Sequence, residues 1–404
     1  MPGPRNTAPV AVQFGAGNIG RGFVGELFHL SGYRIVFVDV DRALVDAMNA
    51  RGRYEVHHVT NAGDEPVAIA GVSALSAAEA EAVIEAVADA TLACTAVGVR
   101  ALRAVAPVLA RGIARRMRSA AAAPLNIVTC ENLVGAGMFL RQLVWTELER
   151  LMAAGECPAA SSLEFDARFG FVEAVVSRMV PIVPDDIRRR DPLWIACEPY
   201  ARLPIDALAC RGAAPKIQGF EPVENILAYQ RRKMASHNMS HAVAAYLGHQ
   251  AGIEFIWQVM DDAAIVRIVR GAMNETGRAL VSRFGFDTAA QRAHEEDLLE
   301  RYRNRALGDQ VRRVAADPLR KLGPEDRLIG SARLCFEEGV DPAHVILGIR
   351  AALDYDNPAD PGAVRLQEMR RTSPLAVVLS QVCGLLLTEP LHARLMPPPV
   401  APPE

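Results

Sequence analysis

Short apolar runs alternate with longer periodic segments in the first half of the chain. Four runs have the length and β-branched content of buried strands: Val10–Phe14, Arg34–Val40, Ala90–Thr95 and Leu125–Thr129. Three segments repeat apolar residues with a helical period: Arg21–Ser31, Ala77–Ala88 and Val99–Met117. Because strands that alternate with helices form parallel sheets covered on both faces, this half predicts a doubly wound parallel α/β sheet.

Helical periodicity dominates the second half of the chain. Its longest periodic segments are Asn225–Ala251, Ile253–Phe284, Ala289–Arg305 and Pro342–Leu353. The regular pattern lapses around Trp194–Gly212, which places the end of the first domain near residue 200. We therefore expect an α/β domain over residues 9–200 and a mostly α-helical C-terminal domain over residues 201–395.

Composition narrows the classes of protein that this pattern allows. The 404 residues suit two domains, half of them are apolar, and the formal net charge is only −3. Without a basic surplus the chain is not expected to bind nucleic acid. Its seven cysteines form no Cys-x-x-Cys pair and are odd in number. This usage favours reduced thiols in the cytoplasm over a disulfide framework or a metal site.

The two ends of the chain are expected to be disordered arms. Residues 1–8 and 396–404 are rich in proline, and the first residues lack the apolar core of a signal peptide. The apolar stretch Pro374–Leu387 is interrupted by Ser380 and Gln381 and is too short to span a bilayer. We expect it to form a buried helix, and we expect no membrane partner.

A glycine-rich turn follows the first predicted strand. Gly15, Gly17 and Gly20 form the pattern G-x-G-x-x-G between this strand and the next helix. The first glycine makes a tight turn, the second lets the backbone approach a pyrophosphate, and the third lets helix and strand pack closely. The free N–H groups at the start of the helix then face the phosphates, as in a Rossmann-type dinucleotide site. The other cofactor contacts expected in this loop are Ala16, Asn18 and Ile19.

An acidic residue indicates NAD as the cofactor. Asp39 ends the second predicted strand, 19 residues after Gly20. A carboxylate at this place accepts hydrogen bonds from the ribose hydroxyls and repels the 2′-phosphate of NADP, although Arg42 lies close by in the sequence. Thr95 and Val97, at the end of a later strand, are expected to touch the same cofactor.

Three polar residues share one side of a predicted helix in the second half. At about 100° per residue, Lys233, His241 and Asn238 fall at roughly 0°, 80° and 140° around the helix. An ammonium, an imidazole and an amide on one side could bind a polyhydroxylated molecule and move its proton. The same pattern fits a solvated helix face beside Arg231 and Arg232. Spacing alone leaves both interpretations open.

Several motifs occur together in a fixed order along the chain. They are Gly15–Phe23, Cys130-Glu131-Asn132, and Lys-x4-Asn-x2-His at 233–241. Further stretches that match in order are Thr95–Gly98, Gly170–Glu173 with Arg178, Ala245–Gly248, Pro318–Leu322 and Asp326–Ile329. Together they resemble the polyol-specific long-chain dehydrogenases, the mannitol dehydrogenase family, over most of the chain.

This resemblance implies an NAD-dependent alcohol dehydrogenase that uses no metal. Lys233 is then the general base that takes the proton of the reacting alcohol. Asn132 and Asn238 donate hydrogen bonds to the oxygen as it becomes a carbonyl, and His241 holds a neighbouring hydroxyl. Burial and the positive nicotinamide ring both disfavour the ammonium form, which lowers the pKa of Lys233 toward neutrality.

Two positions near Lys233 depart from the family pattern. His237 stands where the family is expected to have an apolar residue, and we interpret it as structural. Gln230 stands where some mannitol 2-dehydrogenases place a glutamate that gates proton exit. The absence of this glutamate slightly favours the branch of the family that acts on sugar phosphates.

A substrate phosphate requires cationic side chains. Arg320 and Lys321 are the candidates, because apolar residues flank them on both sides and would hold them at a cleft. Two solvated charges would show the same pattern. Glu173 and Arg178 are expected to form a buried pair that shapes the substrate end of the site.

Three functions are compatible with the sequence. The leading one interconverts D-mannitol 1-phosphate and D-fructose 6-phosphate with NAD. The second is another activity of the same family, on free mannitol or on a hexuronate such as fructuronate. The third is an NAD-binding sensor without catalysis, which has no use for the complete set of Lys233, Asn132, Asn238 and His241. The resemblance implies a monomer or weak dimer.

Overall fold

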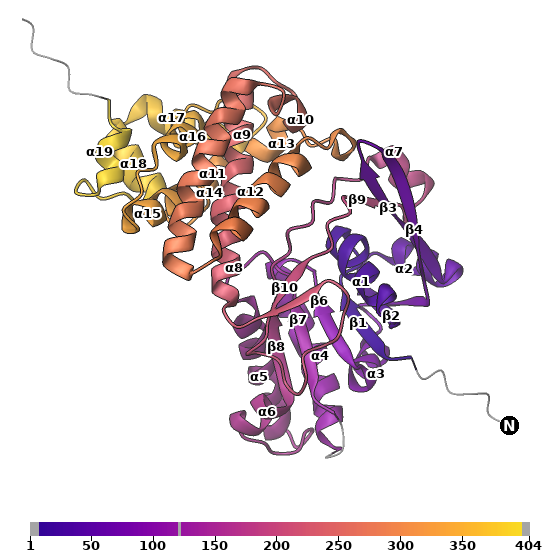
Figure 1. Ribbon diagram of the computed structural model, residues 1–404. Helices are drawn as coiled ribbons and strands as arrows, with labels where there is room; N and C mark the ends of the chain where they lie inside the picture. Colours follow the sequence, from indigo (N-terminus) through magenta and orange to yellow (C-terminus); the bar gives the residue numbers. More distant parts are fainter. Residues whose placement is uncertain (1–7, 120–122, 398–404) are drawn as a thin grey trace, which may run out of the picture. The chain divides into compact units, whose positions relative to one another are not determined.

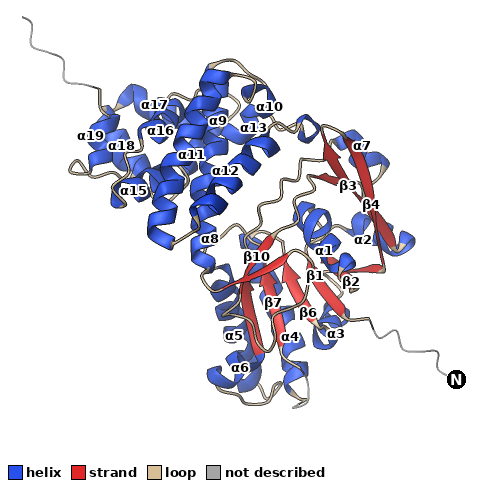
Figure 2. Cartoon of the chain, in the orientation of Figure 1, coloured by secondary structure: helices blue, strands red, loops and turns tan. Residues whose placement is uncertain are grey.

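The computed structural model describes residues 8–119 and 123–397, and the chain divides into two compact units, Met1–Leu227 and Ala228–Glu404. Every strand of the described residues lies in the first unit, and the second unit is built of helices (Figures 1 and 2). The predicted arms, 1–8 and 396–404, fall almost entirely outside the described residues.

A six-stranded parallel sheet organises the first unit. Its strands are β1 (Val10–Phe14), β2 (Arg34–Asp39), β5 (Val72–Ser76), β6 (Leu92–Thr95), β7 (Leu125–Thr129) and β8 (Phe169–Glu173). They lie in the order β5-β2-β1-β6-β7-β8, and every neighbouring pair is parallel. The chain leaves β1 toward one edge and returns to its other side at β6. The predicted doubly wound Rossmann-type sheet is confirmed, and its topological switch point lies between β1 and β6.

Side chains that alternate along the strands fill two apolar cores, one on each face of the sheet. The helices that cover the sheet are α1 (Gly25–Leu30), α2 (Arg42–Arg51), α3 (Ala80–Asp89), α4 (Leu102–Met117) and α5 (Ala136–Ala153). Val12 and Phe14 of β1 pack in the core with α3, α4 and α5. Ala11 packs in the opposite core with α1 and α2. The strands are therefore buried on both sides, which explains their continuous apolar runs.

A second, smaller sheet was missed by the sequence pattern. Its members are β4 (Gly63–Ala70), β3 (Arg53–Thr60) and β9 (Ile195–Cys197). In the hairpin of β3 and β4, the buried apolar residues are Tyr54, Val56 and Ile69. Two short helices also belong to this unit: α6 (Ser162–Arg168) and α7 (Asp185–Arg190).

The first unit extends beyond the predicted boundary near residue 200. Strands β10 (Leu203–Asp206) and β11 (Phe220–Val223) pair with each other in parallel. The N–H of Val175, just after β8, donates to the carbonyl of Pro204 at 2.9 Å. Because these hydrogen bonds fasten residues 201–227 to the sheet, the division falls at 227–228 instead.

Helix α9 (Met239–Gln250) lies at the centre of the second unit, against α10, α11, α13 and α16. The helices around it are α8 (Ile226–Arg232), α10 (Ile256–Val259), α11 (Ala263–Phe284), α12 (Thr288–Tyr302), α13 (Val311–Ala315), α14 (Pro318–Lys321), α15 (Ile329–Glu337), α16 (Ala343–Leu353), α17 (Pro361–Thr372), α18 (Leu375–Cys383) and α19 (Pro390–Leu395). The predicted single helix 253–284 is broken, because Asp262 caps α11 by accepting from the N–H groups of Ala264 and Ile265.

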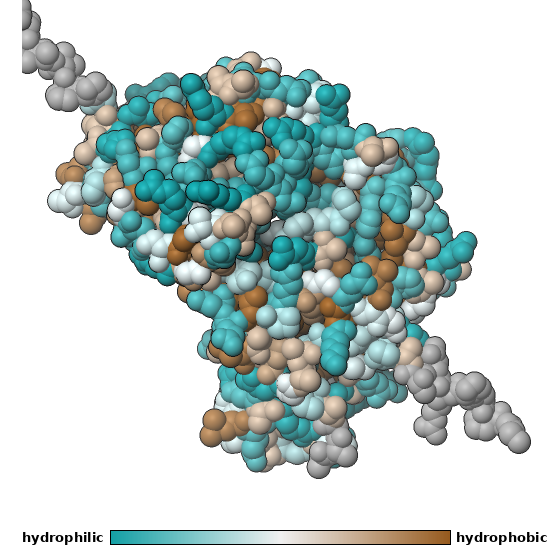
Figure 3. Space-filling view, in the orientation of Figure 1, coloured by the Kyte–Doolittle hydropathy of each residue, from teal (hydrophilic) through white to brown (hydrophobic). Residues whose placement is uncertain are grey.

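The apolar stretch near the end of the chain forms a shorter helix than expected. Helix α18 ends at Gly384, which takes a left-handed conformation, and Leu386 and Leu387 beyond it are exposed. Among the described residues no helix is long and apolar enough to cross a membrane. On the face drawn in Figure 3, hydrophobic residues are scattered among hydrophilic ones.

Candidate active site

The glycine-rich turn is shaped by contacts that exclude side chains. Gly15 has a φ of +87°, and a Cβ on it would lie 2.4 Å from the carbonyl oxygen of Ala96. A Cβ on Gly20 would lie 1.9 Å from the carbonyl oxygen of Gly15. By contrast, a Cβ on Gly17 would meet nothing within 4 Å, so this backbone faces open space. The turn is therefore closed on its protein side and open where a pyrophosphate would lie.

The helix after this turn begins with a π-helical segment, Gly20–Val24. Its widened turn is closed by the bond from the N–H of Gly25 to the carbonyl of Gly20. The buried guanidinium of Arg21 bonds the carbonyl oxygens of Ala16 at 2.5 Å and Pro192 at 3.0 Å. Burial lowers the pKa of Arg21 below its ordinary value. Arg21 thus links the glycine-rich loop at Ala16 to the backbone of Pro192. The sequence pattern did not predict this role.

Asp39 lies at the end of β2 and is held by two backbone groups. Its Oδ2 accepts from the N–H of Ala16 at 2.6 Å, and its Oδ1 accepts from the N–H of Asp41 at 2.9 Å. The side chain of Arg42 turns to Asp46, with 3.0 Å between Nε and Oδ1. Arg42 is therefore paired within its own helix, and Asp39 lines the cavity at the end of β2.

A cavity of about 510 Å³ opens at the carboxyl ends of β1, β2 and β6. It is lined by Phe14, Gly15, Gly17, Val38, Asp39, Val40, Ala77, Ala80, Val83, Ile84, Ala96, Val97, Ala101, Ala104, Val105, Pro107, Val108 and Arg111. A largely apolar pocket with one carboxylate and an open glycine turn beside it fits the adenosine end of NAD. Val97 lines it as expected, whereas Thr95 is fully buried and does not.

Glu131 organises the loop that the sequence placed against the cofactor. Its Oε1 accepts from the N–H of Val97 at 3.0 Å, and its Oε2 accepts from the N–H of Gly98 at 2.8 Å. Asn132 follows Glu131 and is exposed. The carboxylate of Glu131 therefore fixes both the loop after β6 and the start of the loop that carries Asn132. An acidic residue two positions after a buried strand is the signal in the sequence that could have indicated this role.

Glu173 and Arg178 do not form the predicted pair. Glu173, at the end of β8, accepts from the N–H of Gly135 at 3.2 Å. Arg178 forms its ion pair with Glu26, with 2.5 Å between Nη1 and Oε2, and its guanidinium lies 4.7 Å from the ring centre of Phe23. The chain after β8 turns Arg178 toward α1, so the two residues support different parts of the first unit.

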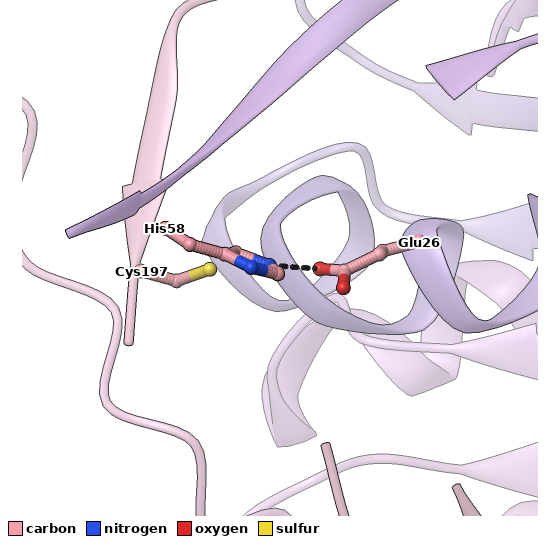
Figure 4. A group of neighbouring side chains, drawn as sticks. All are labelled: Glu26, His58 and Cys197. Atoms are coloured by element: carbon pink, nitrogen blue, oxygen red, sulfur yellow. Dashed lines mark hydrogen bonds and ion pairs between the residues drawn. The ribbon is translucent and has the colours of Figure 1, made fainter. Parts of the chain in front are cut away.

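Arg178 also belongs to a buried cluster next to the dinucleotide loop. The ligand atoms of Glu26 on α1, His58 on β3 and Cys197 on β9 lie within 4.8 Å of one another (Figure 4). Burial raises the pKa of the Cys197 thiol to about 12. Nη1 of Arg178 lies 3.5 Å from Sγ of Cys197, so a guanidinium already supplies positive charge where an ion would bind. We interpret the cluster as a polar tie between α1 and the smaller sheet.

Lys233 and Asn238 lie in a second π-helical segment, Lys233–Asn238, between α8 and α9. The N–H of Met239 donates to the carbonyl of Met234, the i→i+5 bond of a π turn. In an α-helix, which the sequence pattern predicted here, side chains five residues apart point in directions that differ by about 140°. In a turn closed by i→i+5 bonds, residues five apart instead lie on one side. The π turn thus brings Lys233 and Asn238 nearer in direction than the pattern predicted.

His241, one turn later, lies beside a carboxylate and against an aromatic ring. Its Nε2 lies 2.9 Å from Oδ2 of Asp309. The ring of Tyr302 stacks on the imidazole, with 4.8 Å between ring centres and 9° between planes. The hydroxyl of Tyr302 donates to the carbonyl of His237 at 2.9 Å and so is tied to the same helix. Neither Asp309 nor Tyr302 was identified from the sequence.

His237 is buried beneath these groups. Burial, and then the positive charge of Arg301 and the nearby His241 and Lys233, lower the pKa of His237 well below its ordinary value. An imidazole in this setting stays neutral at physiological pH. This supports the structural role that we expected for it.

Arg320 and Lys321 lie in helix α14 but in different surroundings. Lys321 is buried and donates to the carbonyl of Ala316, whereas the side chain of Arg320 is 49% exposed and lies 2.8 Å from Asp317. Burial, and then Arg327 and Arg320, lower the pKa of Lys321 to about 8. Arg327, which the sequence reasoning missed, is therefore part of the same cationic group.

Comparison with known proteins identifies the family of this site. The chain matches the mannitol dehydrogenase Rossmann domain over residues 9–219 and the mannitol dehydrogenase C-terminal domain over residues 225–381. It is 39% identical to the mannitol-1-phosphate 5-dehydrogenase of Brevibacillus brevis, over 95% of both chains. It is 37% identical to the enzyme of that name from Bacillus subtilis, over 96% of this chain and 98% of the relative.

Solved structures share the fold at lower identity. Mannitol 2-dehydrogenase of Pseudomonas fluorescens, in a ternary complex with NAD and D-mannitol, aligns with a TM-score of 0.69 and 19% identity over 93% of this chain and 86% of that chain. A substrate-free D-sorbitol dehydrogenase aligns with a TM-score of 0.75 and 16% identity over 96% and 92%. Both domains of the mannitol dehydrogenase family match, and together the two matches cover most of the chain. The chain therefore belongs to the mannitol dehydrogenase family.

Proposed function

We propose that this protein is an NAD-dependent mannitol-1-phosphate 5-dehydrogenase, which interconverts D-mannitol 1-phosphate and D-fructose 6-phosphate. The main support for a phosphorylated substrate is the cationic group of Arg320, Lys321 and Arg327, in the unit that also contains Lys233. Relatives of this name match nearly the whole chain at 37–39% identity.

The first unit holds the cofactor. The open backbone at Gly17 and the N–H groups of the following turn receive the pyrophosphate, and Asp39 accepts hydrogen bonds from the adenosine ribose. Ala16, Asn18 and Ile19 complete the loop. When bound, NAD supplies the acceptor for the hydride of the alcohol carbon.

Residues 233–241 of the second unit carry the groups that transfer the proton. Lys233 takes the proton from the reacting hydroxyl as general base. Asn238 and Asn132 donate hydrogen bonds to that oxygen as it becomes a carbonyl, which stabilises its developing negative charge. His241 binds an adjacent substrate hydroxyl. In fructose 6-phosphate reduction the same groups act in reverse, and Lys233 returns the proton.

The cationic group recognises the phosphate. Two of these cations pair with carboxylates: Arg320 with Asp317 and Asp326, and Arg327 with Asp326. The ammonium of Lys321 donates to the backbone carbonyl of Ala316 instead, and its charge favours a dianionic phosphate over a neutral hydroxyl.

Lys321 gives phosphate binding a predicted dependence on pH. With a pKa of about 8, Lys321 is charged below pH 8 and loses its charge as the pH rises through that value. The KM for fructose 6-phosphate should therefore rise above pH 8, while the KM for unphosphorylated fructose should not. In Lys321→Arg, which stays charged, the rise should disappear. Parallel pH profiles for the two sugars would remove Lys321 from phosphate recognition.

Asp39 gives a prediction for the cofactor. Asp39→Ala removes a charge-assisted hydrogen bond worth roughly 1.5–3 kcal/mol, so Kd for NAD should rise more than about tenfold. The preference for NAD over NADP should shrink at the same time, since nothing then repels the 2′-phosphate. Titration of protein fluorescence measures both constants. The matched control is Asp186→Ala on helix α7, an exposed aspartate paired with Arg190, which should change neither.

Two alternative functions make different predictions. A family member that acts on free mannitol or fructuronate would use those compounds faster than the phosphate ester. An NAD-binding sensor would bind NAD and turn over nothing. Purified enzyme with NAD and each of mannitol 1-phosphate, mannitol, sorbitol 6-phosphate, and the alcohol that corresponds to fructuronate separates the three, read as NADH absorbance. We expect mannitol 1-phosphate to be used fastest and fructose 6-phosphate to be its product.

The remaining properties follow from the family and the composition. We propose a monomer or weak dimer that acts in the cytoplasm on a small sugar phosphate, without nucleic acid or membrane as partner. All seven cysteines are free thiols, as a reducing compartment favours.

A further inference from the structure

Two backbone carbonyls near the end of the π turn Lys233–Asn238 lie within reach of buried hydroxyl groups. Oγ of Ser240 lies 2.6 Å from the carbonyl oxygen of Ser236 and 3.3 Å from that of His237. The hydroxyl of Tyr302, at the end of helix α12, lies 2.9 Å from the carbonyl oxygen of His237. Both side chains are buried, so water competes little for these carbonyls.

The two hydroxyls also contact each other, with 2.9 Å between Oγ of Ser240 and the phenolic oxygen of Tyr302. Each hydroxyl has one proton to donate, and the two cannot donate to each other at the same time. If Ser240 donates to Tyr302, then Tyr302 donates to the carbonyl of His237. If Tyr302 donates to Ser240, then Ser240 donates to a carbonyl of the turn. In every arrangement of the two protons, at least one carbonyl of the π turn therefore accepts a hydroxyl.

We infer that Ser240 and Tyr302 act together as positioning residues, whose hydroxyls keep the segment Lys233–Asn238 in a π turn and out of an ordinary α-helical turn. π turns are rare in proteins and occur mostly as single turns within α-helices, frequently at functional sites. An α-helical turn here would point Lys233 and Asn238 about 140° apart. The hydroxyl bonds thus maintain the shared direction of these two groups.

This inference rests on the proposed function for its kinetic consequence, because Lys233 and Asn238 then act on the same substrate oxygen. Loss of the π turn should lower kcat and leave Kd for NAD unchanged, since the cofactor residues lie in the first unit. The turn itself can be followed without substrate. Hydrogen exchange of the peptide that contains residues 233–241, measured by mass spectrometry, reports how firmly its amides are bonded.

A double-mutant cycle on the full-length enzyme tests the pair. Tyr302→Phe and Ser240→Ala each leave one hydroxyl, which can still donate to a carbonyl of the turn. Each single variant should therefore lower kcat with NAD and mannitol 1-phosphate less than about threefold. The double variant has neither hydroxyl, so its kcat should fall about tenfold to hundredfold, more than the product of the single effects. Hydrogen exchange in residues 233–241 should likewise accelerate mainly in the double variant.

Thr276→Val/Tyr246→Phe is the matched control in the same unit. Oγ1 of Thr276 makes the same kind of bond within the α-helix α11, at 3.1 Å to the carbonyl of Ala272 and 3.2 Å to that of Met273. The buried hydroxyl of Tyr246 has no hydrogen-bond partner among the residues that the structure describes. This double variant should leave kcat and the exchange of residues 233–241 as in the wild type.

Three results are decisive. Losses of kcat that simply multiply, or a Tyr302→Phe/Ser240→Ala enzyme with the kcat of the wild type, would overturn the inference. A crystal structure of the wild-type protein with residues 233–238 in an ordinary α-helix would do so even if the double variant failed to fold. Faster hydrogen exchange of residues 233–241 in the double variant, in a protein that oxidises no polyol, would count against the proposed function and leave the positioning role intact.

Discussion

Lys233→Ala should lower the rate of alcohol oxidation by roughly a hundredfold to ten-thousandfold, the usual range for loss of a positioned acid or base. Without this amine, no other group of residues 233–241 is expected to take the proton. Burial lowers the pKa of His237 well below its ordinary value, which makes it a weak base, and His241 is paired with Asp309. Steady-state kinetics with NAD and mannitol 1-phosphate measure the loss.

The same variant should bind NAD nearly as well as the wild type, because the cofactor residues lie in the first unit. In the wild type, kcat/KM should rise with pH as Lys233 loses its proton, and this step should vanish in Lys233→Ala. Small primary amines should restore part of the rate by taking the empty place. Near-normal turnover of a folded Lys233→Ala enzyme would remove Lys233 from the mechanism.

Alanine at Arg320 or Lys321 should raise KM for fructose 6-phosphate more than about tenfold. A charge-assisted contact with phosphate contributes roughly 1.5–3 kcal/mol, and this contribution is absent for unphosphorylated fructose. The KM for fructose should therefore change little, so the effect is read as the ratio of the two KM values.

A matched control separates phosphate binding from general charge. Arg365 is an exposed arginine of the same unit, paired with Glu368, and Arg365→Ala should leave both KM values unchanged. An equal rise in KM for both sugars in Arg320→Ala or Lys321→Ala would indicate a structural role for these residues. Lys321 is the more sensitive case, because it is buried and bonded to the carbonyl of Ala316.

The dinucleotide half of the fold could be predicted because its rules are local. A buried strand, three glycines and an acidic residue at a fixed distance follow directly from the requirements of a parallel sheet and a phosphate. Strand β1 begins and ends where the pattern placed it, at Val10 and Phe14. The hairpin β3–β4 was missed because it buries few residues, so neither strand shows a continuous apolar run.

The catalytic half depends on contacts that no local pattern contains. Asp309 lies 68 residues after His241 and meets it only through the packing of α9 and α13. The π turn at Lys233–Asn238 needs an i→i+5 bond, which apolar spacing cannot distinguish from an α-helical one. The pairing of Arg178 with Glu26 rather than Glu173 likewise depends on how the chain turns after β8.

The proposed activity can be tested in one measurement on the wild-type enzyme: the ratio of kcat/KM for mannitol 1-phosphate to kcat/KM for mannitol, with NAD at saturation. Two charge-assisted contacts to the phosphate, each worth roughly 1.5–3 kcal/mol, predict a ratio of at least about a hundred. A ratio near one, or a preference for free mannitol, would contradict the assignment of Arg320 and Lys321 to a phosphate and with it the proposed substrate.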